Sequence, residues 1–206
     1  VMLSYNLIIA NVIPAPPFLF TGASDGAAGI INVTGSRTAA NAIYGNDLDN
    51  ILIGGLANDI IYGMGGTDLI IADRGADTLR GGTGTDTVDY SSTTISVNVN
   101  LATGTIVVDA GPGTIGTIEN IIGTIFNDTL IGDAQNNVIL GGNGNDVMDG
   151  MAGFDTFRFT GAWGNDILTK TGSGIDTLDF STTSANMTVT QSVGLTTIVG
   201  NGYTVR

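Results

Sequence analysis

The sequence predicts an all-β fold, a right-handed parallel β-roll or β-helix solenoid built from nonapeptide repeats. Three observations support this prediction. Glycine accounts for 32 of the 206 residues, while proline accounts for only 4. A nine-residue register recurs along the chain, with Asp or Asn at its sixth position and an apolar residue at its eighth. Apolar residues cluster in threes and lack the 3.6-residue spacing of an amphipathic helix, so no helix is expected.

The register runs without interruption from Gly45 to residue 89 and resumes from Gly123 to residue 158. A weaker unit precedes the first block at 36–44, and two looser units follow the second block. The residues at the sixth position are Asn50, Asp59, Asp68, Asp77, Asp86, Asp128, Asn137, Asp146 and Asp155, with Asp166 and Asp176 in the looser units. The residues at the eighth position are Leu52, Ile61, Ile70, Leu79, Val88, Leu130, Ile139, Met148 and Phe157, with Leu168 and Leu178 in the looser units. A register that persists in this way predicts units stacked on their neighbours.

Each unit combines a short strand with a turn. The three apolar residues form the strand, and the glycine-rich residues form the turn because glycine adopts positive φ at little cost. Side chains alternate along a strand, so only the residue at the eighth position is expected to point inward. Two units make one flattened coil, and residues one coil apart in the sequence lie one above the other.

This stacking brings the carboxylates at the sixth position into columns. Successive coils are about 4.8 Å apart, and two carboxylates ~5 Å apart at an effective dielectric constant of ~20 repel by roughly 3 kcal/mol. A lone Asp would more simply cap a turn, but a cation between coils would turn the repulsion of a column into attraction. Carbonyl groups of the glycine turns would complete an all-oxygen shell, which suits Ca²⁺.

The predicted cofactor is therefore several Ca²⁺ ions. The predicted ligands are Asp59, Asp68, Asp77, Asp86, Asp128, Asp146, Asp155, Asp166, Asp176, Asn50 and Asn137. The predicted pairs in successive coils are Asp59 with Asp77, Asp68 with Asp86, Asp128 with Asp146, and Asp155 with Asp176, and Asp166 is expected to pair with Asp146.

The repeats resemble those of the repeat-in-toxin (RTX) family, whose GGxGxDxUx nonapeptides form calcium-bound parallel β-rolls. The resemblance spans 36–89 and 123–179, and the full GGxGxD hexapeptide stands at 81–86 and 141–146. Other units depart from it, because Leu48, Ala57, Phe126 and Gln135 replace the glycine at the fourth position. We expect those units to bind calcium weakly or only to stack. The resemblance implies a secreted or surface protein of bacterial type.

A longer repeat divides the chain into modules. Residues 86–99 (DTVDYSSTTISVNV) align with residues 176–189 (DTLDFSTTSANMTV). We therefore predict an apolar, uncharged N-terminal arm or cap at 1–29, a first module at 30–118 and a second at 119–206. Because such modules stack readily, the two are expected to continue as one solenoid.

The outer faces of the predicted strands are unusually apolar. Ile51, Ile53, Ile60 and Tyr62 flank inward residues and should face outward by simple alternation. An apolar surface of this size normally has a partner. Residues 1–20 or the longer strands could cover it within the chain, or a second subunit could, and the sequence favours neither alternative. The second alternative predicts a homo-oligomer formed through the outer strand faces and the arm.

Composition excludes several classes of function. Cysteine and histidine are absent, which removes thiol catalysis, disulfides, the usual zinc sites and every His-dependent triad. The net charge of −13 argues against a nucleic-acid partner. The apolar N-terminal stretch is interrupted by Asn6, Asn11 and three prolines, so membrane insertion is not expected. GPGTIG (111–116) matches GxGxxG, but no helix pattern follows it, and we predict a loop there.

The predicted function is that of a non-catalytic, extracellular calcium-binding β-roll with a structural role. The strongest Asp residues all belong to the repeat, so none is left over for catalysis. We expect the chain to fold on binding Ca²⁺ and to self-assemble into a fibre or surface layer. The alternative is an RTX module of a larger secreted enzyme, toxin or adhesin that serves export and folding.

Overall fold

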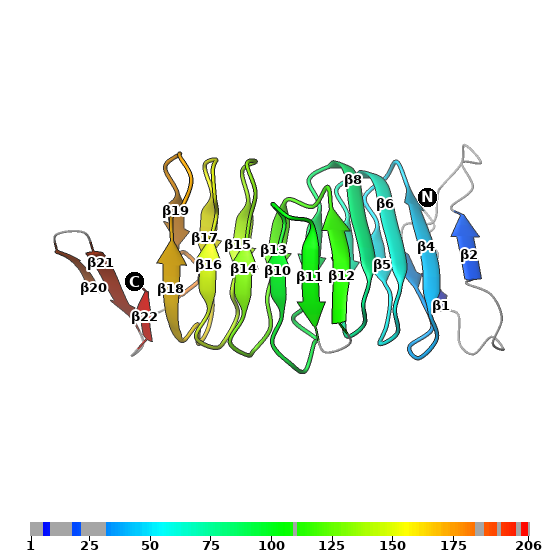
Figure 1. Cartoon of the computed structure of the whole chain (residues 1–206), viewed down its shortest axis with the longest axis horizontal. Helices are drawn as coiled ribbons and strands as arrows, with labels where there is room; N and C mark the ends of the chain where they lie inside the picture. The colour runs from blue at the N-terminus through cyan, green and yellow to red at the C-terminus, as the bar shows by residue number, and fades with distance from the viewer. Residues whose placement is uncertain are drawn as a thin grey trace.

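The computed structural model describes residues 6–8, 18–21, 32–108, 111–183, 188–192, 195–200 and 203–205. In these residues the fold is all-β, with no helix, and two sheets face each other along an elongated solenoid (Figure 1). The first sheet has nine strands and the second has thirteen. The predicted fold class, a parallel β-solenoid built from the nonapeptide repeats, is confirmed. None of the described residues forms a helix that is long and apolar enough to span a membrane.

The first sheet holds one strand from each coil. In spatial order it contains β1 (Asn6–Ile8), β3 (Asn32–Thr34), β5 (Ile51–Ile53), β7 (Leu69–Ile71), β9 (Thr87–Asp89), β13 (Asn120–Ile122), β15 (Val138–Leu140), β17 (Thr156–Arg158) and β19 (Thr177–Asp179). All of its neighbouring strands pair in parallel.

The second sheet holds the other strand of each coil. In spatial order it contains β2 (Phe18–Thr21), β4 (Asn41–Asn46), β6 (Ile60–Gly66), β8 (Thr78–Gly84), β12 (Gly111–Gly116), β11 (Thr105–Val108), β10 (Asn98–Asn100), β14 (Thr129–Ile131), β16 (Val147–Asp149), β18 (Asn165–Thr169), β22 (Tyr203–Val205), β21 (Leu195–Gly200) and β20 (Thr188–Ser192).

The pairing register reproduces the sequence register. Leu52 lies opposite Ile70 in the first sheet, and Ile61 lies opposite Leu79 in the second. Both pairs are 18 residues apart, which is two nonapeptide units and one coil. Backbone hydrogen bonds join successive coils, as in the bond from the Leu69 N–H to the Asn50 carbonyl (2.8 Å). Two nine-residue units therefore make one coil of the solenoid.

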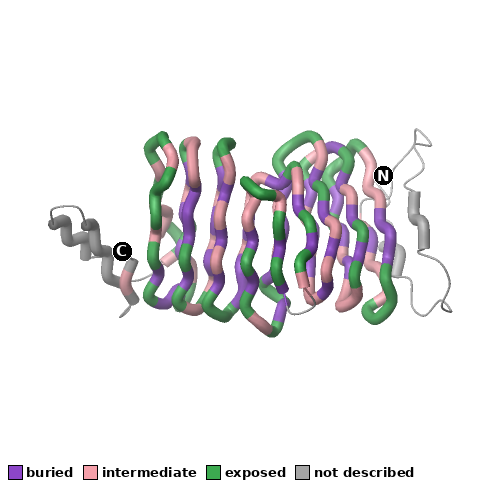
Figure 2. The backbone as a smooth tube through the Cα atoms, in the orientation of Figure 1, coloured by how far each residue is buried: buried purple, intermediate pink, exposed green. Residues whose placement is uncertain are grey.

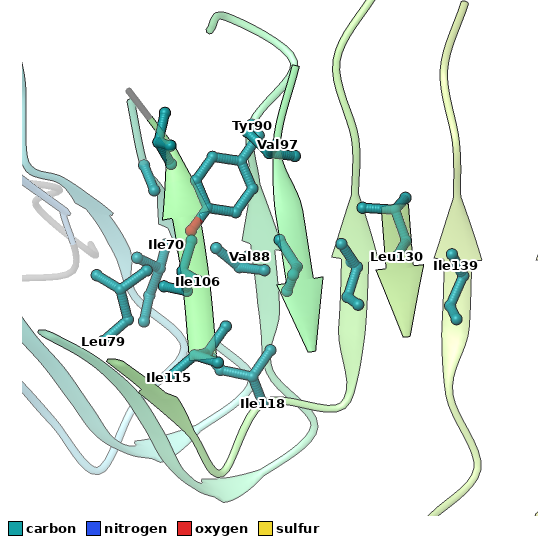
Figure 3. Close-up of a cluster of buried hydrophobic side chains, with 14 of the residues drawn as sticks. Ile70, Leu79, Val88, Tyr90, Val97, Ile106, Ile115, Ile118, Leu130 and Ile139 are labelled. Carbon is teal, nitrogen blue, oxygen red and sulfur yellow. The ribbon is translucent and has the colours of Figure 1, made fainter. Parts of the chain in front are cut away.

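The core is a column of side chains from the eighth position. It contains Leu52, Ile61, Ile70, Leu79, Val88, Leu130, Ile139, Met148 and Phe157, all of which are buried. Figure 2 shows buried segments recurring on successive coils, and Figure 3 shows the central part of the column. The flanking residues face outward as predicted, since Ile51 and Ile60 are 38% and 37% exposed. One inward side chain per strand is thus enough to fill the narrow space between the sheets.

The N-terminal segment adds one coil to the end of the solenoid. β1 pairs in parallel with β3, and β2 pairs in parallel with β4. The rest of the predicted arm at 1–29 lies outside the described residues. The backbone of its two strands thus continues both sheets within the chain.

Where the first block of repeats ends, the second sheet contains a three-stranded antiparallel meander. β10 pairs with β11 and β11 pairs with β12, both antiparallel, while β12 pairs in parallel with β8 of the preceding coil. In the first sheet, β9 pairs directly with β13. Both sheets therefore continue past residue 118 without a break.

The prediction of a loop at GPGTIG (111–116) is wrong, because these residues form β12. Only Thr114, Ile115 and Gly116 pair with β8, so Pro112 lies outside that parallel ladder and its missing N–H costs no bond there. Alternation buries Gly113 and Ile115 and leaves Pro112 and Thr114 exposed. Three glycines and a proline in six residues favour a turn, and the strand alternation in this segment is too short to outweigh that signal in the sequence.

The second block ends in a similar meander. β20, β21 and β22 pair antiparallel in order, and β22 pairs in parallel with β18. This arrangement matches β10, β11 and β12 beside β8. It extends the sequence alignment of 86–99 with 176–189 to the topology, although the division into modules at residue 118 stays a prediction.

Replacing Tyr90 with Phe should stabilise the chain by about 1 kcal/mol. Tyr90 is fully buried in the core, and its hydroxyl has no hydrogen-bond partner in the described part of the chain. An unpaired buried hydroxyl loses its hydration without compensation. The aligned residue in the second module is Phe180, so the core accommodates Phe at this level. The measurement is urea unfolding of both proteins in calcium.

The matched control is Phe180→Tyr, which places a hydroxyl at the second position and should not stabilise. A loss of stability in the Tyr90→Phe protein would show that the hydroxyl has a partner, for example a buried water.

Candidate calcium site

The side chains at the sixth position lie beneath the glycine turns, at the edges of the core. Asp59, Asp68, Asp86 and Asp146 are all buried. A Cβ added to Gly54 would lie 2.5 Å from the Oδ2 atom of Asp59, so the carboxylate would have to move. The glycine that opens each unit therefore leaves room for the carboxylate of that unit.

One oxygen of each carboxylate binds the backbone of the preceding coil. The Asp59 N–H donates to Asp77 Oδ1, and the Asp128 N–H donates to Asp146 Oδ1, both at 2.8 Å. The same bond joins Asp68 to Asp86 (2.8 Å), Asn50 to Asp68 (2.8 Å), Asn137 to Asp155 (2.9 Å), Asp146 to Asp166 (2.9 Å) and Asp155 to Asp176 (3.3 Å). Every predicted pair is therefore brought together in successive coils.

The second oxygen is left without a partner at most of these positions. In the described part of the chain, the buried Oδ2 atoms without a hydrogen bond include those of Asp59, Asp68, Asp86, Asp146, Asp155 and Asp166. Buried acceptors without donors are rare in folded proteins and call for a missing ion or water. Carboxylate oxygens that are held in place and lack a donor fit Ca²⁺, which takes hard oxygen ligands.

Burial makes these carboxylates costly to ionise in the absence of metal. Loss of hydration raises the pKa of Asp59 and Asp68 to about 6, and it raises the pKa of Asp77, Asp146 and Asp166 to about 7. At Asp146, the neighbouring carboxylates of Asp166 and Asp128 raise the pKa further, while the bond from the Asp128 N–H lowers it. The columns thus favour a proton or a cation.

The acidic residues occur in columns and not in clusters. No three acidic side chains converge on one point in the described residues. A calcium ion between coils would therefore take one or two carboxylates and draw its remaining ligands from backbone carbonyl groups or water. The mixed shell of carboxylates and carbonyl groups stays a prediction.

The turn backbone supports this arrangement through positive φ angles. Gly142 and Gly144 have φ of 99° and 117°, and a Cβ at Gly144 would lie 2.5 Å from the Phe126 carbonyl oxygen of the preceding coil. Met64 and Met151 stand where Gly142 stands in its unit, and they also have positive φ, 85° and 66°. These two turns keep the same conformation despite the strain of a side chain.

Two predicted ligands already have partners for both carboxylate oxygens. Asp128 Oδ2 accepts the Thr124 N–H (2.6 Å), while Oδ1 accepts the Thr124 hydroxyl (3.0 Å) and the Val97 N–H (2.8 Å). Asp176 Oδ2 forms an ion pair with Lys170 Nζ at 2.6 Å. Protein groups occupy the positions that a cation would take at the other aspartates.

The two predicted asparagine ligands hold their own turns. Asn50 Oδ1 accepts the Asn46 N–H (2.9 Å), and Asn137 Oδ1 accepts the Asp133 N–H (2.8 Å). Their Nδ2 atoms donate to Asn46 Oδ1 (3.1 Å) and the Glu119 carbonyl (2.8 Å). A neutral amide with both ends bonded needs no counter-ion.

Two residues of the columns are not among the predicted ligands, namely Glu119 and Asn41, the latter at the sixth position of the weaker unit at 36–44. Glu119 Oε2 accepts the Asp86 N–H at 2.8 Å, which is the bond that the Asp of the next coil makes elsewhere. Asn41 Nδ2 donates to Asp59 Oδ1 at 2.8 Å and closes the column at its other end. Glu119 could have been noticed, because it is the one Glu among nineteen acidic residues and directly precedes a repeat block.

A protein-family comparison matches this geometry to a known repeat. The model of the RTX calcium-binding nonapeptide repeat (4 copies) matches residues 44–79, 65–92 and 122–157. Residues 44–92 and 122–157 therefore consist of RTX-type nonapeptide repeats. The matched segments contain the stacked turns described above, so calcium binding is a property of the repeat to which they belong. The number of ions is not given by this match.

Similarity to solved structures includes an extracellular lipase. The extracellular lipase LipA from Serratia marcescens is 17% identical, and the alignment covers 82% of this chain and 37% of the lipase at a TM-score of 0.28. The chain thus spans little more than a third of the lipase. No curated protein matches the sequence significantly.

Proposed function

We propose that this protein is a calcium-gated structural solenoid that folds outside the cell. The observation that carries the proposal is the set of buried Oδ2 atoms without hydrogen-bond partners. These atoms recur in successive coils, and the match to the RTX calcium-binding repeat supports the choice of metal. The residues that would hold the ions are Asp59, Asp68, Asp86, Asp146, Asp155 and Asp166.

Calcium would control folding through the negative charge of the aspartate columns. In the metal-free chain at neutral pH, folding must strip water from the carboxylates and bring them near each other, so the unfolded state is favoured. When bound, Ca²⁺ would supply the positive charge that offsets this cost. The glycine turns hold each carboxylate in place, and the N–H of the preceding coil fixes its Oδ1 atom.

An extracellular location fits this gate. Extracellular calcium modules bind their ions at roughly 10⁻⁴–10⁻³ M, so the low calcium of a cytoplasm would leave the repeats open for export. At free calcium ten times Kd, each site would add roughly 1.4 kcal/mol to folding. Several such sites decide whether the chain is folded, which suits a non-catalytic structural role.

Self-association is the second part of the proposal. Apolar side chains on the outer faces support it. Val147 and Ile167 pair on neighbouring strands and are 37% and 48% exposed, and Ile51 and Ile60 are exposed elsewhere on the solenoid. Contact between such faces would bury apolar area in an assembly of solenoids.

The test is a calcium titration of the full chain after chelation. Circular dichroism should show little β structure without calcium and a cooperative gain of it as calcium is added, while magnesium should act weakly. Light scattering in the same titration reports particle size. Full β structure in excess chelator at pH 7.5 would overturn the gate, and folding without growth in particle size would overturn the self-association.

A further inference from the structure

The C-terminal end of the solenoid has two open strand edges. β19 ends the first sheet and β20 ends the second, and neither has a partner on its outer side among the described residues. Open edges carry unpaired N–H and C=O groups and readily accept another strand. These two edges correspond to β9 and β10 in the first module, as the alignment of 86–99 with 176–189 shows.

In the first module the same two edges are occupied. β13 pairs in parallel with β9, and the Tyr90 N–H donates to the Ile122 carbonyl at 2.9 Å. β14 pairs in parallel with β10, and the Leu101 N–H donates to the Ile131 carbonyl at 2.9 Å. At the internal junction, edges of this kind therefore bind the first two strands of a following module in parallel.

The end of the core is also unfinished. Val88 and Tyr90 are fully buried at the internal junction, whereas the aligned Leu178 and Phe180 are only partly buried. Ile175, just before β19, is 80% exposed. The side chains that the start of a module covers in the middle of the chain are uncovered at its end.

The strand directions permit one particular occupant. A three-stranded meander reverses direction twice, so β20 runs parallel to β18 and to every strand that continues the repeats in the second sheet, β2 included. All strands of the first sheet are parallel, so β19 and β1 also run the same way. The leading edges β1 and β2 of another copy therefore have the polarity that β13 and β14 have at the internal junction.

We propose that a second copy of this chain docks head to tail on this end, with β1 on β19 and β2 on β20. The contact repeats the internal junction between molecules, and it rests on the proposed function only in requiring the folded state. A head-to-tail contact uses different surfaces on each partner, and here those surfaces lie at opposite ends of one elongated solenoid. Such a contact leaves a free end after every addition, so it generates a filament and not a closed ring. The filament axis would be the solenoid axis.

Disulfide cross-linking of the full chain tests this docking, because the chain has no cysteine of its own. Thr87 pairs with Asn120 at the internal junction, and Asn6 pairs with Asn32 at the N-terminal coil. The docked register therefore places Thr177 opposite Asn6 of the next copy. Neighbouring strands lie about 4.8 Å apart, which is within the Cα separation that a disulfide spans. The variant Asn6→Cys with Thr177→Cys should form a ladder of linked dimers, trimers and longer chains under mild oxidation in calcium.

The matched control is Asn6→Cys with Thr87→Cys. Thr87 has a similar local sequence (DTVDY against DTLDF), but β7 and β13 already occupy both sides of its strand. Docking in register raises the effective concentration of the thiols, so the test variant should exceed this control about tenfold or more in linked product. Light scattering of the cysteine-free parent in calcium should show particles that grow with protein concentration.

The outcomes separate docking from calcium gating. Cross-linking above the control that persists in chelator, with β structure retained, supports docking and overturns the gate. Cross-linking equal to the control in a chain that circular dichroism shows to be folded overturns docking and leaves the gate standing. A folded parent that stays a single chain at all concentrations also overturns docking, and it would assign the edge to a further module of a longer chain.

Discussion

Replacing Asp146 with Asn should weaken folding in calcium and strengthen it in chelator. Asp146 is fully buried between Asp128 and Asp166, its Oδ1 accepts the Asp128 N–H, and its Oδ2 has no partner in the described part of the chain. An amide keeps the Oδ1 bond and the shape of the side chain but carries no charge. The variant therefore removes a calcium ligand and, at the same time, a carboxylate that is costly to bury.

The two effects have opposite signs and comparable size. In calcium, loss of one site should cost about 1.4 kcal/mol at free calcium ten times Kd. In chelator at pH 7.5, loss of a carboxylate whose burial raises its pKa to about 7 should stabilise the chain by on the order of 2 kcal/mol, allowing for screening by solvent. Urea unfolding followed by circular dichroism, in calcium and in chelator, measures both differences.

Asp128→Asn is the matched control in the neighbouring coil. Both oxygens of Asp128 already accept protein donors, with Thr124 bonding to each of them. An amide nitrogen there would face a donor, so this variant should lose about 1–3 kcal/mol in calcium and in chelator alike. If Asp146→Asn lost stability in calcium and in chelator alike, as this control should, the carboxylates with an unpaired Oδ2 atom would be structural acceptors and not calcium ligands.

The fold could be predicted from the sequence because the repeat period fixes which strands pair. Paired residues in successive coils are two periods, or 18 residues, apart. Each nonapeptide supplies one strand, and each coil needs two, so residues separated by two units must lie side by side, as Leu52 and Ile70 do. Inward orientation at the eighth position follows from strand alternation alone. Long-range pairing, which is usually the hardest feature to read from a sequence, is here a local property of the repeat.

The junction could not be predicted, because its strands do not follow the period. Pairing of β12 with β8 joins Leu79 to Ile115, which lies in the segment between residue 89 and Gly123 where the nonapeptide register is absent. The partners of the individual carboxylates were equally hidden. Asp128 contacts Thr124, and Asp176 contacts Lys170. Both partners lie outside the sixth position, so the repeat register, in which every Asp is equivalent, does not predict these contacts.

Without calcium, the folded chain should lose stability as the pH rises from about 4 to about 7. Burial raises the pKa of Asp59 and Asp68 to about 6, and it raises the pKa of Asp77, Asp146 and Asp166 to about 7. The unfolded chain titrates near the ordinary value of about 4. Between these values the folded state binds more protons than the unfolded state, so stability must fall with increasing pH.

The predicted slope is steep because several groups titrate together. Each group that is protonated only in the folded state contributes up to about 1.4 kcal/mol per pH unit. Protons and Ca²⁺ neutralise the same oxygens, so they are expected to replace one another. We expect the metal-free chain to fold near pH 4.5 and to unfold by pH 7.5, with a midpoint between about 6 and 7.

Calcium should abolish this transition and not merely shift it. A carboxylate bound to the metal has no proton to lose, and the apparent affinity for the metal rises as competing protons leave. Circular dichroism across pH 4.5–8, in chelator and in millimolar calcium, provides the comparison. A metal-free chain that became more stable with rising pH would mean that the buried carboxylates are ionised at no cost, and neither protons nor metal would then gate the fold. Because the same columns predict both the acid-stabilised and the calcium-stabilised state, the two curves should meet at low pH and diverge only as the aspartates ionise.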